Sequence, residues 1–191
     1  MEEKINIAAI LKDKQNGLRL YSPIFGECTF CCVREDTNDI CVKKHNGVIE
    51  YFNYEGLYCA LGEVMLFPSK EMRDWNKFTW KKGDVLTNSS GFKIFFDKWA
   101  NEYYTKFLGK IKLLGDSHCY DTAYYTLASE EEALEFINSV EEINNGKLNR
   151  ETLEIEKPEF KDGDIVAVDL DRKNIRIFKE KKNGNNICWG K

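Results

Sequence analysis

The sequence lacks the segments that direct a protein into or across a membrane. Its 191 residues hold no apolar run near the ~20 residues needed to cross a bilayer. The N-terminus, Met1-Glu2-Glu3-Lys4, opens with acids and is not followed by the apolar core of a signal peptide. We therefore expect a cytoplasmic protein with no membrane partner.

The sequence also lacks the motifs of common enzymes. Gly83 and Gly163 stand alone, without the glycine spacing or the Gly-Lys-Ser/Thr of phosphate-binding loops. Asp116-Ser117-His118-Cys119 combines acid, nucleophile and base, but catalytic groups usually meet across a fold and seldom as neighbours. We interpret this segment as a polar loop between strands. Glu130, Glu131 and Glu132 are explained by the electrostatics of a helix start. We expect no enzyme and no cofactor.

Histidine is scarce, with two residues, and the seven cysteines are odd in number and irregular in spacing, which does not favour a disulfide framework. Cys28, Cys31, Cys41 and His45 have the residue types and roughly the spacing of a zinc site. Thr29-Phe30 between the first two cysteines favours a strand over the tight turn of a zinc knuckle. We interpret these cysteines as buried thiols, so no metal site is predicted.

What is present suits a folded, strand-rich chain. Apolar residues make up 42%, with 12 Phe, 9 Tyr and 4 Trp, which suffices for a core. The net charge of −4 gives no overall attraction to nucleic acid. Acids dominate 129–156 and bases dominate 157–191, and we interpret both as solvated faces.

One short pattern occurs twice. Trp80-Lys81-Lys82-Gly83-Asp84 and Phe160-Lys161-Asp162-Gly163-Asp164 are each followed by β-favouring residues. Glycine supplies a left-handed conformation, aspartate accepts from nearby amides, and the aromatic ring packs under the turn. The repeat predicts two similar turns that each start a strand, as in small SH3-like barrels.

Local signals predict most of the elements. Ile5, Ala8, Ala9 and Leu11-Lys12 predict a short first helix that Asn6 caps and Gly17 ends, and strands follow over 18–21 and 27–33. Asn46-Gly47 favours a type I′ hairpin that pairs Lys43 with Glu50 and Val42 with Tyr51. Its buried face is then expected to carry Ile40, Val42, Ile49 and Tyr51.

Further along the chain, Val64–Phe67 resembles a central strand, and Ser69 is expected to cap a short helix through Met72 and Trp75. Further strands are predicted near 84–87, 91–98, 102–108, 122–127 and 152–155. Ser129 and Glu132 form a predicted capping box for one long helix near 129–143, which Asn144-Asn145-Gly146 ends.

The expected fold class is α+β, predominantly antiparallel β, built from small SH3-like or bent-sheet modules with this one long helix. Three modules are expected: a β-rich module over 1–78, an α+β module over 79–157, and a β-tail over 158–191.

Six segments of the chain carry a resemblance to a known family: KINIAAILKD, LYSP..GE, LFPSKEMRDW, F.W.KGDVL, ASEEEALEF and PEFKDGDIV. The chain resembles a family of proteins from gut bacteria and their prophages for which no activity is established. The resemblance implies a mobile-element setting and assigns no site residues.

The binding residues predicted from the sequence are aromatic and basic. Trp99, Tyr103 and Tyr104 alternate with bases such as Lys106, and Lys181-Lys182 lie in the basic tail. Exposed aromatic residues dominate protein interfaces, so the first hypothesis is a module that binds an unidentified protein, a homodimer included. Stacking on single-stranded bases is the alternative, which makes nucleic acid the second candidate partner.

Overall fold

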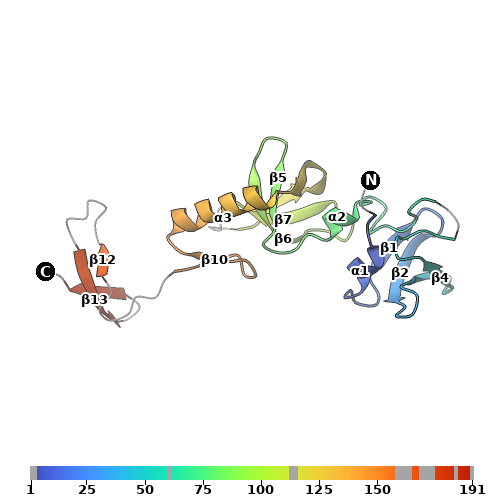
Figure 1. Cartoon of the computed structure of the whole chain (residues 1–191), viewed down its shortest axis with the longest axis horizontal. Helices are drawn as coiled ribbons and strands as arrows, with labels where there is room; N and C mark the ends of the chain where they lie inside the picture. The colour runs from blue at the N-terminus through green and yellow to red at the C-terminus, as the bar shows by residue number, and fades with distance from the viewer. Residues whose placement is uncertain are drawn as a thin grey trace.

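The computed structural model describes residues 4–59, 62–111 and 116–157, and the backbone of 165–167, 175–182 and 185–189. The described chain forms four antiparallel sheets and one long helix (Figure 1). The predicted α+β, predominantly antiparallel class is therefore confirmed.

The N-terminal sheet has the order β1-β2-β3-β4. Its strands are β1 (Arg19–Ser22), β2 (Gly26–Val33), β3 (Ile40–Lys44) and β4 (Ile49–Phe52). The short helix α1 (Ile7–Leu11) packs its buried residues into the core under this sheet. Asn6 caps α1 as predicted, because its side chain accepts a hydrogen bond from the Ala9 amide at 2.9 Å.

The hairpin between β3 and β4 has a different register from the predicted one. Lys43 pairs with Ile49 and Val42 with Glu50, because the Gly47 amide donates to the Lys44 carbonyl and Gly47 has a φ of +84°. This is a three-residue loop with glycine in the left-handed position, not a two-residue type I′ turn. The prediction was wrong by one position on β4, and a shift of one residue turns every β4 side chain over.

The shift exchanges the two faces of β4. Phe52 is buried, while Ile49 and Tyr51, which were expected in the core, are each 48% exposed. The predicted Lys43–Glu50 pair is replaced by Lys44–Glu50, at 2.6 Å. Ile40 and Val42 are buried as predicted.

The segment before the middle module also differs from its prediction. Residues Val64–Phe67 form isolated bridges, with Phe67 opposite Tyr21, and not a central strand. The Ser69 hydroxyl accepts from the Met72 amide, but the helix α2 (Trp75–Phe78) starts later and is capped by Asp74. Ser69 therefore closes a turn, and the competing Asp74 carboxylate sets the helix start.

The middle sheet has the order β8-β7-β6-β5-β9. Its strands are β5 (Val85–Asn88), β6 (Lys93–Trp99), β7 (Lys106–Lys110), β8 (His118–Asp121) and β9 (Tyr125–Leu127). β7 begins four residues later than predicted, because the Asn101 side chain bonds Thr105 and holds a loop there. The segment 116–119, which was interpreted as a polar loop, contributes His118 and Cys119 to β8.

The first copy of the repeated turn is built as predicted. Gly83 has a φ of +87°, the Asp84 carboxylate accepts from the Lys81 amide at 2.7 Å, and Trp80 is buried beneath. The second copy, Phe160 to Asp164, lies outside the described residues. The strands beyond it, β12 (Ile165–Ala167), β13 (Ile175–Lys182) and β14 (Asn185–Trp189), form a three-stranded sheet.

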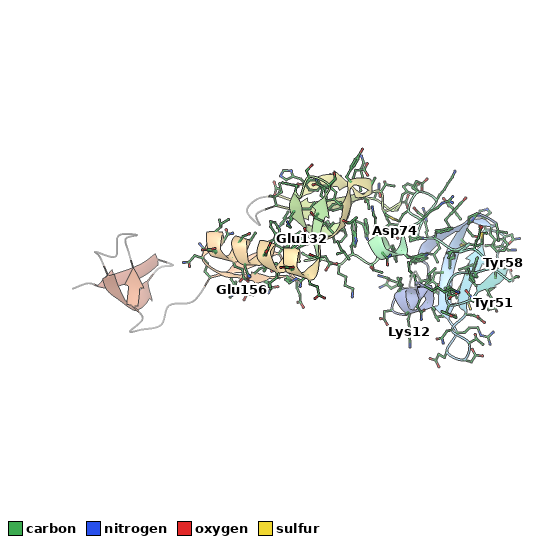
Figure 2. All side chains as sticks on the ribbon, turned by 45° about the horizontal axis from the view of Figure 1, so that its top comes forward. Lys12, Tyr51, Tyr58, Asp74, Glu132 and Glu156 are labelled. Atoms are coloured by element: carbon green, nitrogen blue, oxygen red, sulfur yellow. The ribbon has the colours of Figure 1, made fainter. Side chains whose placement is uncertain are left out.

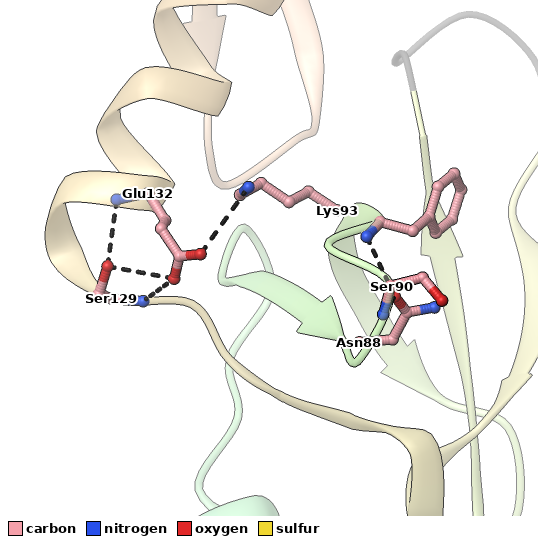
Figure 3. Close-up of polar contacts among 6 residues, drawn as sticks. Asn88, Ser90, Lys93, Ser129 and Glu132 are labelled. Carbon is pink, nitrogen blue, oxygen red and sulfur yellow. Dashed lines mark hydrogen bonds and ion pairs between the residues drawn. The ribbon is translucent and has the colours of Figure 1, made fainter.

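The long helix α3 (Glu130–Asn144) begins with the predicted capping box. Ser129 and Glu132 bond each other's backbone amides, and Glu132 also lies 3.9 Å from the Lys93 ammonium (Figure 3). The helix packs Phe136 on Phe95 of β6, with ring centroids 4.9 Å apart. A two-stranded sheet, β10 (Lys147–Asn149) and β11 (Glu154–Glu156), follows it.

Candidate protein-binding surface

The aromatic residues predicted to bind a partner lie mainly where the N-terminal and middle modules meet. Trp99 stacks on Trp80 at 5.8 Å between ring centroids. Tyr104 meets Trp99 and Phe78 edge-on, and burial raises the pKa of its hydroxyl. Trp99 and Tyr104 are thus partly buried and packed against other rings of the chain.

The other predicted binding residues are more open. Tyr103 is 44% exposed, although its carbonyl accepts a hydrogen bond from the Ser69 hydroxyl at 2.8 Å. Lys106 is exposed at the start of β7. Lys181 and Lys182 pair through their backbone with Asn186 and Asn185 on β14, and their side chains lie outside the described residues.

The N-terminal sheet carries an apolar surface that the sequence did not predict. Val48, Ile49 and Tyr51 are each about half exposed, and we call these three residues the β4 surface. On β3, Val42 pairs with Glu50 and Ile40 pairs with Phe52, and Ile40, Val42 and Phe52 are in the core. Ile49 and Tyr51 alternate with Glu50 and Phe52 along β4, so they point away from the core. Figure 2 shows Tyr51 on the N-terminal sheet, remote from α3.

Among the described residues, no strand lies along the outer side of β4. β4 is the last strand in its sheet, and the Lys44 amide donates to the Val48 carbonyl at 2.8 Å. Because hydrogen-bonded pairs alternate along an antiparallel ladder, Glu50 and Phe52 bond β3, whereas the amides and carbonyls of Ile49 and Tyr51 face away from it. Such an edge is a template for an added strand.

Polar groups on the core side of β4 hold the strand in place. The Lys44 ammonium lies 2.6 Å from the Glu50 carboxylate, and the Tyr58 hydroxyl donates to the same carboxylate at 3.0 Å. These two contacts lower the pKa of Glu50, and the bond to Glu50 raises the pKa of Tyr58. Lys44 also lies 4.8 Å from the centre of the Phe25 ring.

Positive groups flank the β4 surface on its outer side. Arg34 lies over the Tyr51 ring, 5.9 Å from its centroid, and binds Asp36 through two hydrogen bonds. Lys43 is the exposed cross-strand neighbour of Ile49. The surface therefore combines apolar side chains with a cation next to each of its two strand positions.

The residues of the zinc pattern are distributed over both faces of the sheet. Cys28 is in the core, Cys41 lies opposite Cys32, and His45 is in the exposed hairpin loop. Within the described ranges, no three His, Cys, Asp or Glu side chains are grouped so that they could hold an ion. Cys28 and Cys41 are buried, as predicted for the cysteines in general, whereas Cys31 is half-buried and Cys32, Cys59 and Cys119 are exposed, so for these residues the prediction was wrong.

The other acidic and nucleophilic clusters have structural partners. The Ser117 hydroxyl donates to the Asp97 carboxylate at 2.9 Å, and His118 is exposed on β8. Glu132 is used by the helix cap. These contacts give Ser117 and Glu132 structural roles.

A cavity of about 470 Å³ lies beside α1 and α2. Ile7, Val64 and Trp75 are among its apolar lining residues, and Glu55 pairs with Lys4 across 3.1 Å at its border. Its volume falls in the range of small-ligand sites, but Glu55 already pairs with Lys4, and Asp74 is used as the cap of α2.

No helix among the described residues is both long and apolar enough to span a membrane. Comparison of the chain with protein-family models, with curated proteins and with solved structures finds no match. The chain's own geometry is therefore the basis for assigning a function.

Proposed function

We propose that this protein is a non-enzymatic binding module that takes an extended segment of a partner protein along β4. Following the resemblance of its sequence, we also propose a phage or mobile-element accessory role in the cytoplasm. The observation that carries the proposal is the coincidence of an open strand edge with exposed apolar side chains at Ile49 and Tyr51.

The backbone supplies affinity in this binding mode. An added strand would bond the free amides and carbonyls of Ile49 and Tyr51, which are two residues apart and face the same side. Backbone bonding is tolerant of sequence, so it explains attachment but not choice of partner.

The side chains supply selectivity. Alternate residues of an added strand lie on the same face as Ile49 and Tyr51, so we expect the partner segment to carry apolar side chains at every second position. Covering the exposed half of one such side chain stabilises the complex by about 1 kcal/mol. Lys43 next to Ile49 favours an acidic residue in the segment, whereas Arg34 over Tyr51 is already paired with Asp36.

A second copy of the chain is one such partner. Two β4 edges related by a two-fold axis would pair antiparallel and bring their apolar faces together. Light scattering over a range of concentrations separates this homodimer from a complex with another protein.

The proposal is tested by selecting binders from a displayed peptide library with the immobilised full chain. We expect extended, alternating apolar peptides that lose at least tenfold in affinity for the double variant I49K/Y51K, since two apolar contacts are lost and two charges are added. The matched control is Y124K/L134K, which changes two exposed apolar residues of the middle module.

The selection also separates protein binding from nucleic-acid binding. If enriched peptides bind I49K/Y51K as well as the wild type, or if neither peptides nor self-association are found, the β4 proposal is wrong. Binding of single-stranded oligonucleotides that falls steeply with salt would favour the alternative, whose predicted stacking residues Trp99 and Tyr104 are packed internally.

A further inference from the structure

A bulge in β2 places two successive cysteines, Cys31 and Cys32, opposite one residue of β3. Phe30 pairs with Val42 and Cys32 with Cys41, so Cys31 is the extra residue on the bulged strand. A bulge of this kind places two residues opposite one. Cys31 and Cys32 both therefore lie opposite Cys41.

The three thiols differ in access to solvent. Cys32 is exposed, Cys31 is half-buried and Cys41 is buried. The Cys31 thiol donates weakly to the Thr29 carbonyl at 3.7 Å. Cys41 borders Cys32 and Cys31 on β2, Tyr51 on β4, and the Arg34 guanidinium that lies over Tyr51.

We propose that Cys32 and Cys41 are a dithiol–disulfide pair. Cys32 forms a mixed disulfide by reaction with a low-molecular-weight disulfide, and Cys41 then displaces the small thiol from Cys32. Opposed residues on antiparallel strands have Cα atoms about 4.5–5.5 Å apart, which lies inside the range that a disulfide bridges. The arrangement also supplies one accessible thiol to meet the oxidant and one enclosed thiol beside it. This inference does not rest on the proposed binding function, although Cys41 pairs with Tyr51 of the β4 surface.

The reaction is two successive exchanges. The Cys32 thiolate attacks one sulfur of the small disulfide, the sulfur–sulfur bond breaks, and one small thiolate leaves and takes a proton from water. Cys41 loses its proton to solvent and its thiolate attacks the Cys32 sulfur, releasing the second small thiol. Two protein thiols are oxidised to one disulfide, and the small disulfide is reduced to two thiols.

The second exchange depends on the protonation of Cys41. Burial, and next the hydrogen bond with the Cys32 thiol, raise the pKa of Cys41 to about 12, while the Arg34 charge acts in the opposite direction. Because only the thiolate attacks, closure is slow at neutral pH and rises roughly tenfold per pH unit below that pKa. We expect the mixed disulfide at Cys32 to accumulate at pH 7 and to close at pH 9.

The experiment treats the reduced full-length protein with oxidised glutathione at pH 7 and at pH 9, without denaturant. The reaction is quenched with acid, and the products are mapped by mass spectrometry after tryptic digestion below neutral pH. Cleavage after Arg19, Arg34 and Lys43 separates residues 20–34, with Cys28, Cys31 and Cys32, from residues 35–43, with Cys41. A link between these two peptides identifies the pair, and fragmentation assigns the cysteine.

The expected result is a Cys32–Cys41 link that persists in Cys31→Ser and is lost in Cys41→Ser, where Cys32 retains bound glutathione. Cys59 and Cys119 are exposed and serve as internal controls that take up glutathione. If the linked peptides never form in the wild type at pH 9, or if fragmentation of the wild-type link and its loss in Cys31→Ser show that Cys31 makes it, the assignment is overturned. Both outcomes are read on folded wild-type protein or on Cys31→Ser, so a variant that fails to fold does not decide the test.

Discussion

At the residue scale, Gly83 permits a contact between segments far apart in the sequence. Arg150 donates from Nε and Nη2 to the Gly83 carbonyl, at 3.2 and 3.0 Å. A Cβ at position 83 would lie 2.5 Å from the Arg150 carbonyl oxygen. The glycine is therefore required both by its backbone conformation and by the approach of Arg150.

We expect Gly83→Ala to destabilise the protein by about 3 kcal/mol, since the left-handed conformation costs about 1 kcal/mol and the steric conflict adds 1–3 kcal/mol. Gly91→Ala is the matched control, because Gly91 has a φ of +74° but open space around it. Urea unfolding measures both. Equal losses in the two variants would show that the Arg150 contact is unimportant.

Glu50 gives a residue-scale prediction on pH. Its pKa is lowered in the folded protein by hydrogen bonds from Lys44 and Tyr58, so the folded state binds a proton less readily than the unfolded state. The stability from this carboxylate is present above its unfolded pKa of about 4.3 and is lost as the pH falls through the folded value.

We therefore expect Glu50→Gln to reduce stability at pH 7 and to flatten the dependence of stability on pH below about 4.3. Glu135→Gln, at an exposed position on α3, is the control. Urea unfolding at a series of pH values measures the effect. A wild-type and a Gln variant with parallel acid profiles would contradict the role given to Glu50.

At the scale of the element, α3 depends on its cap. The Glu132 amide donates to the Ser129 hydroxyl at 3.2 Å, and the Ser129 amide donates to Glu132 at 3.0 Å. We expect Ser129→Ala to lower the free energy of unfolding by about 1 kcal/mol. Ser139→Ala is the control, because Ser139 is exposed within the helix and bonds only the Phe136 carbonyl. Circular dichroism during urea unfolding provides the measurement, and equal effects would argue against the cap.

Elements set by neighbouring residues could be predicted from the sequence. The Asn6 cap, the Ser129 capping box and the Gly83 turn each depend on side chains within a few positions of the backbone groups that they bond. A residue type and a spacing therefore suffice to predict them.

Elements set by competing geometries could not be predicted. Asn46-Gly47 is compatible with two hairpin loops, and the difference of one residue decides whether Ile49 and Tyr51 are buried or exposed. Because the β4 surface depends on the exposure of those two side chains, the sequence could not place it. Val64–Phe67 is apolar enough for a strand, but only tertiary contacts show that it forms isolated bridges.

At the scale of the whole molecule, the first two modules are joined by specific contacts. Phe78 and Tyr104 meet with ring centroids 5.0 Å apart, Arg19 pairs with Glu102 at 2.8 Å, and Lys77 donates to the Thr122 carbonyl at 2.9 Å. Packing of this kind couples the unfolding of the two sheets.

We expect the N-terminal and middle modules to unfold in one transition, and Tyr104→Gly to separate it into two. Glycine accepts the φ of +60° at position 104 but removes the ring that joins Phe78 to Trp99. Tryptophan fluorescence and circular dichroism during urea unfolding should then cease to coincide. Tyr103→Gly is the control, and a single transition in both variants would show that Tyr104 does not couple the modules.

The strand order of the middle sheet has a consequence for synthesis of the chain. β5 lies between β6, its neighbour in sequence, and β9, whose Leu127 pairs with Leu86. Until residues 125–127 have left the exit tunnel of the ribosome, one side of β5 has no strand beside it, and nascent chains with such open edges associate with each other. Release of residues 125–127 from the exit tunnel ends this vulnerable interval and lets α3 assemble on the finished sheet.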